Sequence, residues 1–206
     1  MSRMPVGGLP PRHATAWSHA TQHPFLEAVR DGTITESAFA AWLVQDYHFV
    51  SDLLAFQGRL LARAPRRAQA VLAGGAVALV DELSWFEEQA AAQQLDLTQP
   101  PRPQTAAYSV LLSELDDADV PVALTALWAI ERVYLDAWSF AARGIPAYRV
   151  FAAHWTTPEF ATYVSELEQA ADAVATRPAQ QDVETAFLAV LDAESCFWAM
   201  ALEDEA

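Results

Sequence analysis

Apolar residues along this chain recur at helical spacing, and no segment shows the sustained alternation that is typical of a β-strand. Alanine is abundant, and proline and glycine separate the periodic segments. We therefore predict an all-α, single-domain helical bundle of about seven or eight helices. The predicted helices span about 13–30, 35–63, 66–94, 104–116, 120–143, 147–154, 157–175 and 179–203.

Local signals define the boundaries of these helices. Asp31-Gly32 ends the first, and Thr35 is a good N-cap for the second, which we expect to be interrupted or bent near Gly58. Ala64-Pro65 ends that second helix. We expect residues 1–12 to form a loose N-terminal tail and residues 13–206 to form the helical domain.

Charge and composition exclude several classes of function. The formal net charge is −15 and all 12 basic residues are arginine. Nucleic-acid binding needs basic patches, and Schiff-base chemistry and Walker-type phosphate loops need lysine, so all three are disfavoured. With 53% hydrophobic residues the chain is too apolar for disorder. No window is long enough to span a bilayer and no secretion signal is recognisable, so we expect a cytoplasmic protein.

Thiol and metal chemistry are also disfavoured. Cys196 is the only cysteine, which excludes an internal disulfide and a thiolate-rich metal site. It is expected to be a small buried hydrophobe that points away from Glu194. Di-iron bundles pair Glu-x-x-His motifs on two helices, but none of the five histidines completes that spacing here. We expect no metal and no cofactor.

Glu194 lies in an apolar run near the C-terminus, on nearly the same helical face as Phe197 and Trp198. Because a face with two large aromatic residues is normally buried, we expect Glu194 to be buried too. A buried carboxyl group must find a partner, shift its pKa or meet a ligand.

Asp46 has a similar aromatic setting, with Trp42 and Phe49 flanking it on one helical face. Two interpretations stay open. Asp46 either faces solvent or caps a neighbouring backbone, or it orients a ligand beneath aromatic walls.

Two further acidic positions are candidates. Glu131 and Tyr134 are neighbours on one face of an apolar helix. Either they share a polar ligand, or Glu131 only satisfies the core by pairing with Tyr134 or with an arginine. Glu82 stays open as a site residue. Asp81 is expected to be solvated because Glu87 and Glu88 give the same helix an acidic face.

A series of short motifs follows one another along most of the chain. They are Trp17, His23-Pro24-Phe25, Asp31-Gly32-Thr33-Ile34, Phe39, Gln45-Asp46-Tyr47, Tyr108, Tyr134, Glu159-Phe160 and Glu194-x-x-Phe197-Trp198. In this order they resemble the TenA family, the thiaminase II-like proteins with a heme-oxygenase-like fold, and the order makes the resemblance fairly specific. The family is known for cleaving or hydrolysing pyrimidine compounds in thiamin salvage, generally as homo-oligomers without metal or heme.

The resemblance implies roles for individual residues. Asp46 matches the family aspartate that grips the aminopyrimidine, and Glu194 matches the terminal glutamate of the active site. Tyr108 and Phe197 match residues that line the pocket. Phe49 stands in place of a family tyrosine, so one hydroxyl group is missing.

Other positions depart further from the family pattern. Trp155 stands where the family usually has a tyrosine, and the catalytic cysteine of the fifth helix is absent. Leu127 or Ile130 takes its place, and Glu131 or Tyr134 then stands where a family tyrosine would. The chain resembles the cysteine-less branch, in which acidic residues replace the thiol. That branch is associated with hydrolysis of amino- or formylaminopyrimidines.

The leading hypothesis is therefore hydrolysis of a C–N bond by water, with Glu194, Glu131 or Glu82 as the base and Asp46 polarising the ring. We expect Tyr134 and Tyr108 to position the ring edge. The expected walls of the ring pocket are Phe197, Trp155 and Phe49. A binding or regulatory protein and an oxidase of the same fold are the alternatives. The surplus of aromatic residues favours a homodimer or homotetramer.

Overall fold

Helices form all the regular secondary structure in the part of the chain that the computed structural model describes, residues 5–144, 148–174 and 179–203. The N-terminal elements are η1 (Val6–Gly8), α1 (Leu9–Arg12), α2 (Ala14–Thr21) and α3 (Pro24–Asp31). The helices that follow are α4 (Glu36–Arg63), α5 (Arg66–Gln93), α6 (Pro103–Asp117), α7 (Val120–Ala141), α8 (Arg149–His154), α9 (Pro158–Val174) and α10 (Gln180–Met200). The predicted all-α fold is confirmed. Residues 147 and 175, at the ends of two predicted helices, lie outside the described residues.

Prolines and capping side chains explain the boundaries. The Thr35 hydroxyl accepts a hydrogen bond from the Ala38 N–H at 3.1 Å, as expected of an N-cap. The single helix predicted over residues 13–30 is wrong, because α2 ends at Thr21, Gln22 and His23 are not helical, and a new helix starts at Pro24. Proline disfavours helical geometry in the residue before it, and the His23 ring caps the new helix. No interruption occurs at Gly58, where α4 is continuous.

α7 is the central helix of the bundle. It is apolar on almost every side and packs against α2, α3, α4, α6, α8, α9 and α10. A helix that is hydrophobic all round is stable only when it is enclosed, so its neighbours surround it. Glu131, in the middle of α7, is consequently only 6% exposed.

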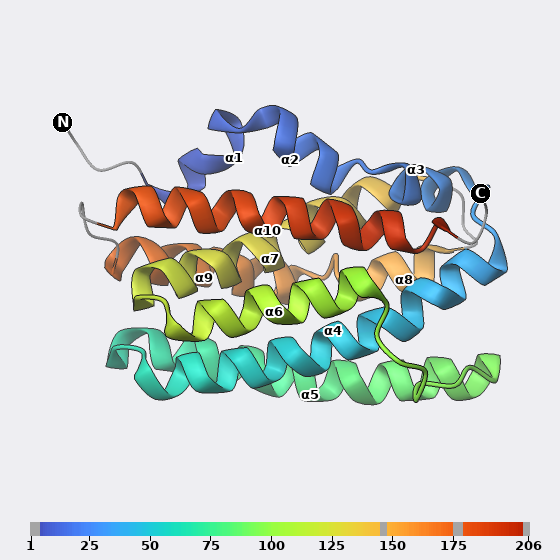
Figure 1. Ribbon diagram of the computed structural model, residues 1–206, viewed down its shortest axis with the longest axis horizontal. Helices are drawn as coiled ribbons and strands as arrows, with labels where there is room; N and C mark the ends of the chain where they lie inside the picture. Colours follow the sequence, from blue (N-terminus) through green and yellow to red (C-terminus); the bar gives the residue numbers. More distant parts are fainter. Residues whose placement is uncertain (1–4, 145–147, 175–178, 204–206) are drawn as a thin grey trace.

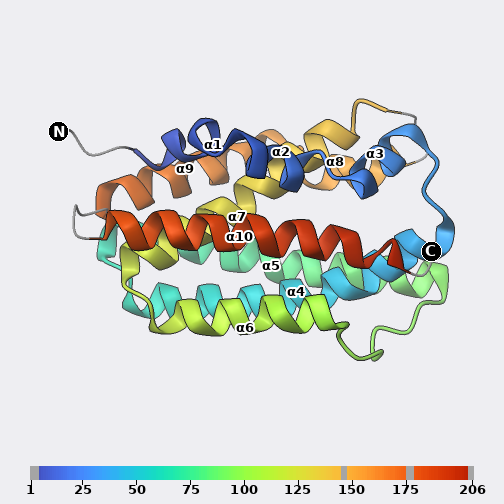
Figure 2. The same ribbon diagram turned by 45° about the horizontal axis from the view of Figure 1, so that its top comes forward.

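The other long helices run along the same axis as α7 (Figure 1). α4 packs against α5 and α6, α5 packs against α9, and α10 packs against α6 and α7. The turned view shows α10 alongside α7, with α1 to α3 on the same side of α10 as α8 and α9 (Figure 2). α4, α5, α7 and α10 therefore belong to one packed bundle, although they are distant along the chain.

The N-terminal segment differs from the predicted loose tail. Residues 6–12 form η1 and α1, and the side chains of Val6 and Leu9 are buried in the hydrophobic core. The Val6 N–H donates to the Asp172 carboxylate of α9 at 2.9 Å. Residues 1–4 of the predicted tail lie outside the described residues.

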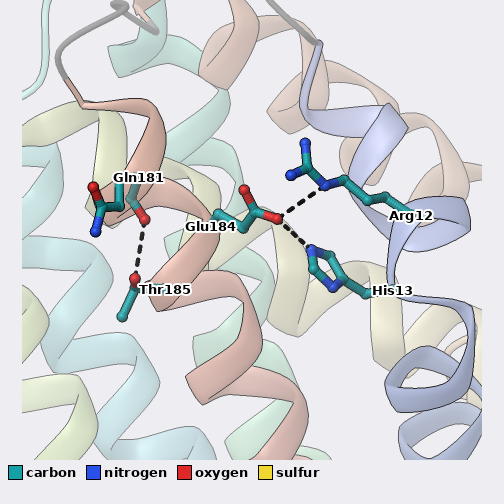
Figure 3. Close-up of polar contacts among 5 residues, drawn as sticks. All are labelled: Arg12, His13, Gln181, Glu184 and Thr185. Carbon is teal, nitrogen blue, oxygen red and sulfur yellow. Dashed lines mark hydrogen bonds and ion pairs between the residues drawn. The ribbon is translucent and has the colours of Figure 1, made fainter.

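An ion-pair cluster also ties this segment to α10 (Figure 3). The Glu184 carboxylate lies 3.0 Å from Nε of Arg12 and 2.7 Å from Nε2 of His13. Two isolated apolar residues, Val6 and Leu9, give no periodic signal, so the sequence did not predict that this segment docks. Its partners, α9 and α10, are distant in sequence.

The aromatic residues pack inside the bundle. All seven tryptophans are either buried or partly buried against the core. In the described part of the chain, the exposed large hydrophobic residues are aliphatic: Val77, Val80, Val110, Val150 and Leu188. The aromatic content therefore gives no argument for an assembly, and the homo-oligomer stays a prediction. Among the described helices, none is long and apolar enough to cross a membrane.

Docking of the N-terminal segment can be tested with Leu9→Ala. Because the Leu9 side chain is buried, we expect the free energy of unfolding to fall by about 2–4 kcal/mol in urea denaturation. Thr15→Ala, at an exposed position of α2, is the control and should change it by less than about 0.5 kcal/mol. Equal, small effects of both substitutions would contradict the docking.

Candidate functional site

Asp46 lies on α4 and is fully buried. Residues three and four positions away on the same helix, Trp42 and Phe49, are buried as well, so the helical period carries Asp46 into the core with them. The Tyr134 hydroxyl of α7 donates to Oδ1 of Asp46 at 2.5 Å. The interpretation in which Asp46 faces solvent is wrong.

Glu194 forms a matching pair on the other side of the interior. Its side chain on α10 is fully buried, together with Phe197 and Trp198. The Tyr108 hydroxyl of α6 donates to Oε1 of Glu194 at 2.7 Å. The predicted burial of Glu194 is confirmed, and of the two interpretations left open for Asp46 the buried one holds.

Phe49 connects these two tyrosine–carboxyl pairs. Its ring centroid lies 4.6 Å from that of Tyr108 and 6.0 Å from that of Tyr134, with which it is stacked. The Phe197 ring lies 5.6 Å from Phe49. The predicted wall residues Phe49 and Phe197 thus lie together with both tyrosines.

Each of the two acids has one oxygen left over. Within the described residues, Oδ2 of Asp46 and Oε2 of Glu194 are buried and have no hydrogen-bond partner. An unsatisfied buried acceptor costs about 1–3 kcal/mol, and more when it is charged. Each of these oxygens can accept a hydrogen bond from a buried water or from a ligand that brings hydrogen-bond donors.

A cavity of about 740 Å³ is lined mainly by α5, α9 and the chain between α8 and α9. Neither Asp46 nor Glu194 is among its lining residues, so the two tyrosine–carboxyl pairs lie deeper in the core than the cavity wall. Glu82, Glu131, Trp155 and Tyr163 are among its lining residues. The Trp155 indole N–H donates to Oε1 of Glu82 at 2.7 Å. Two of the predicted site residues, Glu82 and Trp155, are therefore direct partners at the cavity.

Glu131 faces the same cavity, which answers the question that the sequence left open. Its neighbour is Tyr163 of α9, not Tyr134, which bonds to Asp46 instead. The Tyr163 hydroxyl lies 3.5 Å from Oε1 of Glu131 and 3.2 Å from Oε1 of Gln57 on α4. The interpretation in which Glu131 and Tyr134 satisfy each other in the core is therefore wrong.

Sequence reasoning missed Gln57 and Tyr163. Gln57 lies 11 residues after Asp46, which is three helical turns, so both residues share one face of α4. Tyr163 follows Glu159 by four residues, and both line the cavity. These spacings were the available signals, but a glutamine and a tyrosine on amphipathic helices do not stand out from ordinary core and surface residues.

The four carboxyl groups, Asp46, Glu82, Glu131 and Glu194, influence one another electrostatically. Burial raises the pKa of Asp46 well above its ordinary range, and repulsion from Glu82 and Glu194 adds to the effect. Burial likewise raises the pKa of Glu82 to about 7. It raises the pKa of Glu131 to about 8, with a contribution from Glu82, and that of Glu194 to about 8. Neutral pH therefore lies within the range where this cluster exchanges protons.

Two other sequence interpretations can be compared with the structure. Cys196 is exposed, so the expectation of a buried hydrophobe is wrong. It lies on the side of α10 away from Glu194, and the site has no thiol.

Asp81 is exposed as expected and lies among the residues that line the cavity. In the described part of the chain, no group of three or more histidine, cysteine, aspartate or glutamate side chains is arranged to hold a metal ion.

A model of the TENA/THI-4/PQQC family matches residues 10–204. The chain belongs to this family. It is 31% identical over 205 residues to a protein of Glycine max named "Probable bifunctional TENA-E protein", covering 92% of this chain and 90% of that protein.

Solved structures share the architecture. A TenA homologue from Pyrococcus furiosus superposes with a TM-score of 0.91 and 26% identity, covering 96% of this chain and 100% of that one. A domain with a heme oxygenase-like fold from Shewanella denitrificans superposes with a TM-score of 0.79 and 16% identity, covering 99% of this chain and 94% of that one. The predicted TenA-like family and heme-oxygenase-like fold are confirmed.

The buried carboxyl groups should make stability depend on pH. The pKa of Glu194 is raised from 4.5 to about 8 in the folded protein, so between these values the folded state holds a proton that the unfolded chain has lost. The free energy of unfolding should therefore fall as the pH rises from about 4.5 to about 8. In Glu194→Gln this contribution is absent, because glutamine carries no charge and can still accept the Tyr108 bond.

Urea denaturation at pH 4.5 and at pH 8.5 measures this effect. At each pH, the free energy of unfolding of wild type is subtracted from that of Glu194→Gln. This difference should be about 1–3 kcal/mol more favourable to the variant at pH 8.5 than at pH 4.5. Asp192→Asn, an exposed position on the same helix, should follow the wild-type pH dependence. A pH dependence of Glu194→Gln equal to that of wild type would show that Glu194 is not a buried titrating group.

Proposed function

We propose that this protein hydrolyses a C–N bond of an aminopyrimidine or formylaminopyrimidine in thiamin salvage, with carboxyl groups in place of a thiol. The observation that carries the proposal is the pair of orphaned carboxylate oxygens on Asp46 and Glu194. Each belongs to a carboxyl group that a tyrosine holds by its other oxygen, beside the ring of Phe49. The similarity to the TENA-E protein of Glycine max supports it.

A planar heterocycle with N–H donors suits this arrangement. Asp46 accepts hydrogen bonds from the exocyclic amino group and from a protonated ring nitrogen, and so stabilises the protonated ring. The positive charge on that nitrogen draws electron density out of the ring and favours attack. Tyr134 and Tyr108 contact the ring edge. Aromatic walls stack on the ring faces or enclose them, and the residues in this role are Phe49, Phe197 and Trp155.

Water is the nucleophile, since Cys196 is exposed on the outer side of α10. The water oxygen bonds to the carbon atom, the C–N bond breaks with its electron pair on nitrogen, and no net oxidation occurs. One carboxylate takes the proton from water and a protonated carboxyl group supplies one to the departing nitrogen. Glu194, Glu131 and Glu82 are the groups available, and their pKa values of about 8, about 8 and about 7 suit proton transfer near neutral pH.

Turnover of an aminopyrimidine by Glu194→Gln tests this function. Because the variant keeps the Tyr108 contact but cannot exchange a proton, we expect kcat for ammonia release to fall by at least about 100-fold with the fold intact by circular dichroism. Asp192→Asn, exposed on the same helix, should keep the wild-type rate.

Calorimetry with the same aminopyrimidine separates the main alternative. Binding by the wild-type protein without any product would contradict hydrolysis and support a binding or regulatory role. Unchanged turnover in Glu194→Gln would contradict the assignment of this residue.

A further inference from the structure

Gln57 has a fixed orientation inside the bundle. It is fully buried, and its amide Nε2 donates to the backbone carbonyl of Leu72 on α5 at 2.8 Å. A carbonyl oxygen only accepts hydrogen bonds, so the amide nitrogen must face Leu72. The amide oxygen of Gln57 is therefore turned toward Tyr163 and is an acceptor there.

This orientation determines the direction of the next hydrogen bond. The Tyr163 hydroxyl has one proton, and its nearest partner is Oε1 of Gln57 at 3.2 Å, which can only accept. Tyr163 therefore donates to Gln57. Oε1 of Glu131 is a second acceptor for the same hydroxyl, but it lies farther away, at 3.5 Å. With the proton directed at Gln57, the hydroxyl oxygen turns a lone pair toward Glu131.

A lone pair that faces a carboxyl oxygen favours a proton on that carboxyl group. The chain then runs from the Glu131 O–H to the Tyr163 oxygen and from the Tyr163 O–H to the Gln57 carbonyl. A Tyr163 proton shared with Glu131 favours the carboxylate and lowers the pKa of Glu131. Gln57 opposes this effect, because its carbonyl oxygen is the nearer acceptor for that proton.

The other two acids have the opposite arrangement. Tyr108 donates to Glu194, and Tyr134 donates to Asp46, so both bonds favour the carboxylate form. The site therefore treats its carboxyl groups differently, although burial raises all their pKa values.

We propose that Gln57 is a positioning residue that, through Tyr163, keeps Glu131 protonated as the acid of the reaction. This inference rests on the proposed function. As the C–N bond breaks, its electron pair goes to nitrogen and Glu131 delivers its proton there, while Glu194 takes the proton of the attacking water. Atoms and charge balance, because one proton enters the carboxyl pair and one leaves it.

Gly75 of α5 makes room for this chain. A Cβ atom at position 75 would lie 2.3 Å from the Tyr163 hydroxyl and 2.4 Å from Nε2 of Gln57. Its neighbour Gly74, which also lines the cavity, would meet nothing within 4 Å. The missing side chain at position 75 thus lets α4, α5 and α9 bring Gln57 and Tyr163 together.

The groups facing Glu131 from the surrounding helices are also acidic or phenolic. Glu82 from α5 and Glu194 from α10 repel a charge on Glu131, and Tyr163 contacts it from α9. Tyr108 of α6 interacts with it electrostatically. Asp46 of α4 interacts with Glu82 and Glu194. His154 lines the same cavity, and burial lowers its pKa, so it stays neutral near pH 7.

Gln57→Leu tests the proposal. Without its acceptor, Tyr163 turns its proton to Glu131, and the pKa of Glu131 should fall by about one unit. The readout is the pH titration of the protonated-carboxyl infrared band, assigned to Glu131 by its loss in Glu131→Gln. The apparent pKa on the basic side of the pH profile of kcat/KM for the aminopyrimidine should fall by the same amount.

The double variant Gln57→Leu/Tyr163→Phe removes the donor as well. Its Glu131 titration should return to the wild-type midpoint or above, as in Tyr163→Phe alone. A loosened core would not be reversed by a second deletion. Gln45→Leu, another buried glutamine of α4 that contacts Pro100, Arg102 and Thr105, should leave the midpoint unchanged.

Should Gln57→Leu fail to fold, Gln57→Met removes the same acceptor with a side chain of similar length. An unshifted or raised midpoint in the folded variant, or a double variant as low as the single one, overturns the proposal. The infrared midpoints can behave as expected while the wild-type protein does not turn over the aminopyrimidine. That outcome would support the hydrogen-bond chain and overturn the role of Glu131 in hydrolysis.

Discussion

Three carboxyl groups buried among aromatic residues, with a fourth beside them at the cavity, are the constraint on which the rest of this structure depends. Asp46, Glu131 and Glu194 are buried, Glu82 is partly exposed, and the four come from four different helices and interact electrostatically. An isolated buried charge is costly, so such groups stay protonated or find donors. The tyrosines beside them are accordingly part of the fold as well as part of the site.

Hydrogen-bond polarity can distinguish acids that are otherwise alike. Burial is the main cause that raises the pKa of Glu131 and of Glu194 to about 8, and a tyrosine contacts each of them. Tyr108 donates to Glu194 at 2.7 Å, while the Tyr163 hydroxyl lies nearer to Gln57 than to Glu131 and, in the arrangement proposed above, donates to Gln57. A reaction that needs one base and one acid at the same pH can obtain both from two glutamates when their neighbours are oriented differently.

Much of the fold and part of the site could be predicted from sequence, because both follow from local rules. Proline, glycine and an N-cap at Thr35 mark helix ends within the chain, and aromatic neighbours at helical spacing place Asp46 and Glu194 inside. What the sequence could not show depends on partners from distant elements. Val6 and Leu9 dock because α9 and α10 accept them, and Glu131 meets Tyr163 only once α7 and α9 are side by side.

The orphaned oxygens link stability to ligand binding. Without a ligand, Oδ2 of Asp46 and Oε2 of Glu194 have no donor among the described residues. Protonation of these carboxyl groups then lowers the cost of burying them, because it removes their charge. A ligand that brings its own N–H groups relieves the same penalty in the bound state, and part of its affinity comes from this relief. Replacing the acids by apolar residues would remove the unpaired oxygens but would leave the buried hydroxyls of Tyr134 and Tyr108 without their acceptors. It would also remove the interaction that, in the proposed function, distinguishes an amine-bearing ring from a hydrocarbon of the same shape. The proposed selectivity therefore comes from the same unsatisfied atoms that are costly to bury in the unliganded protein.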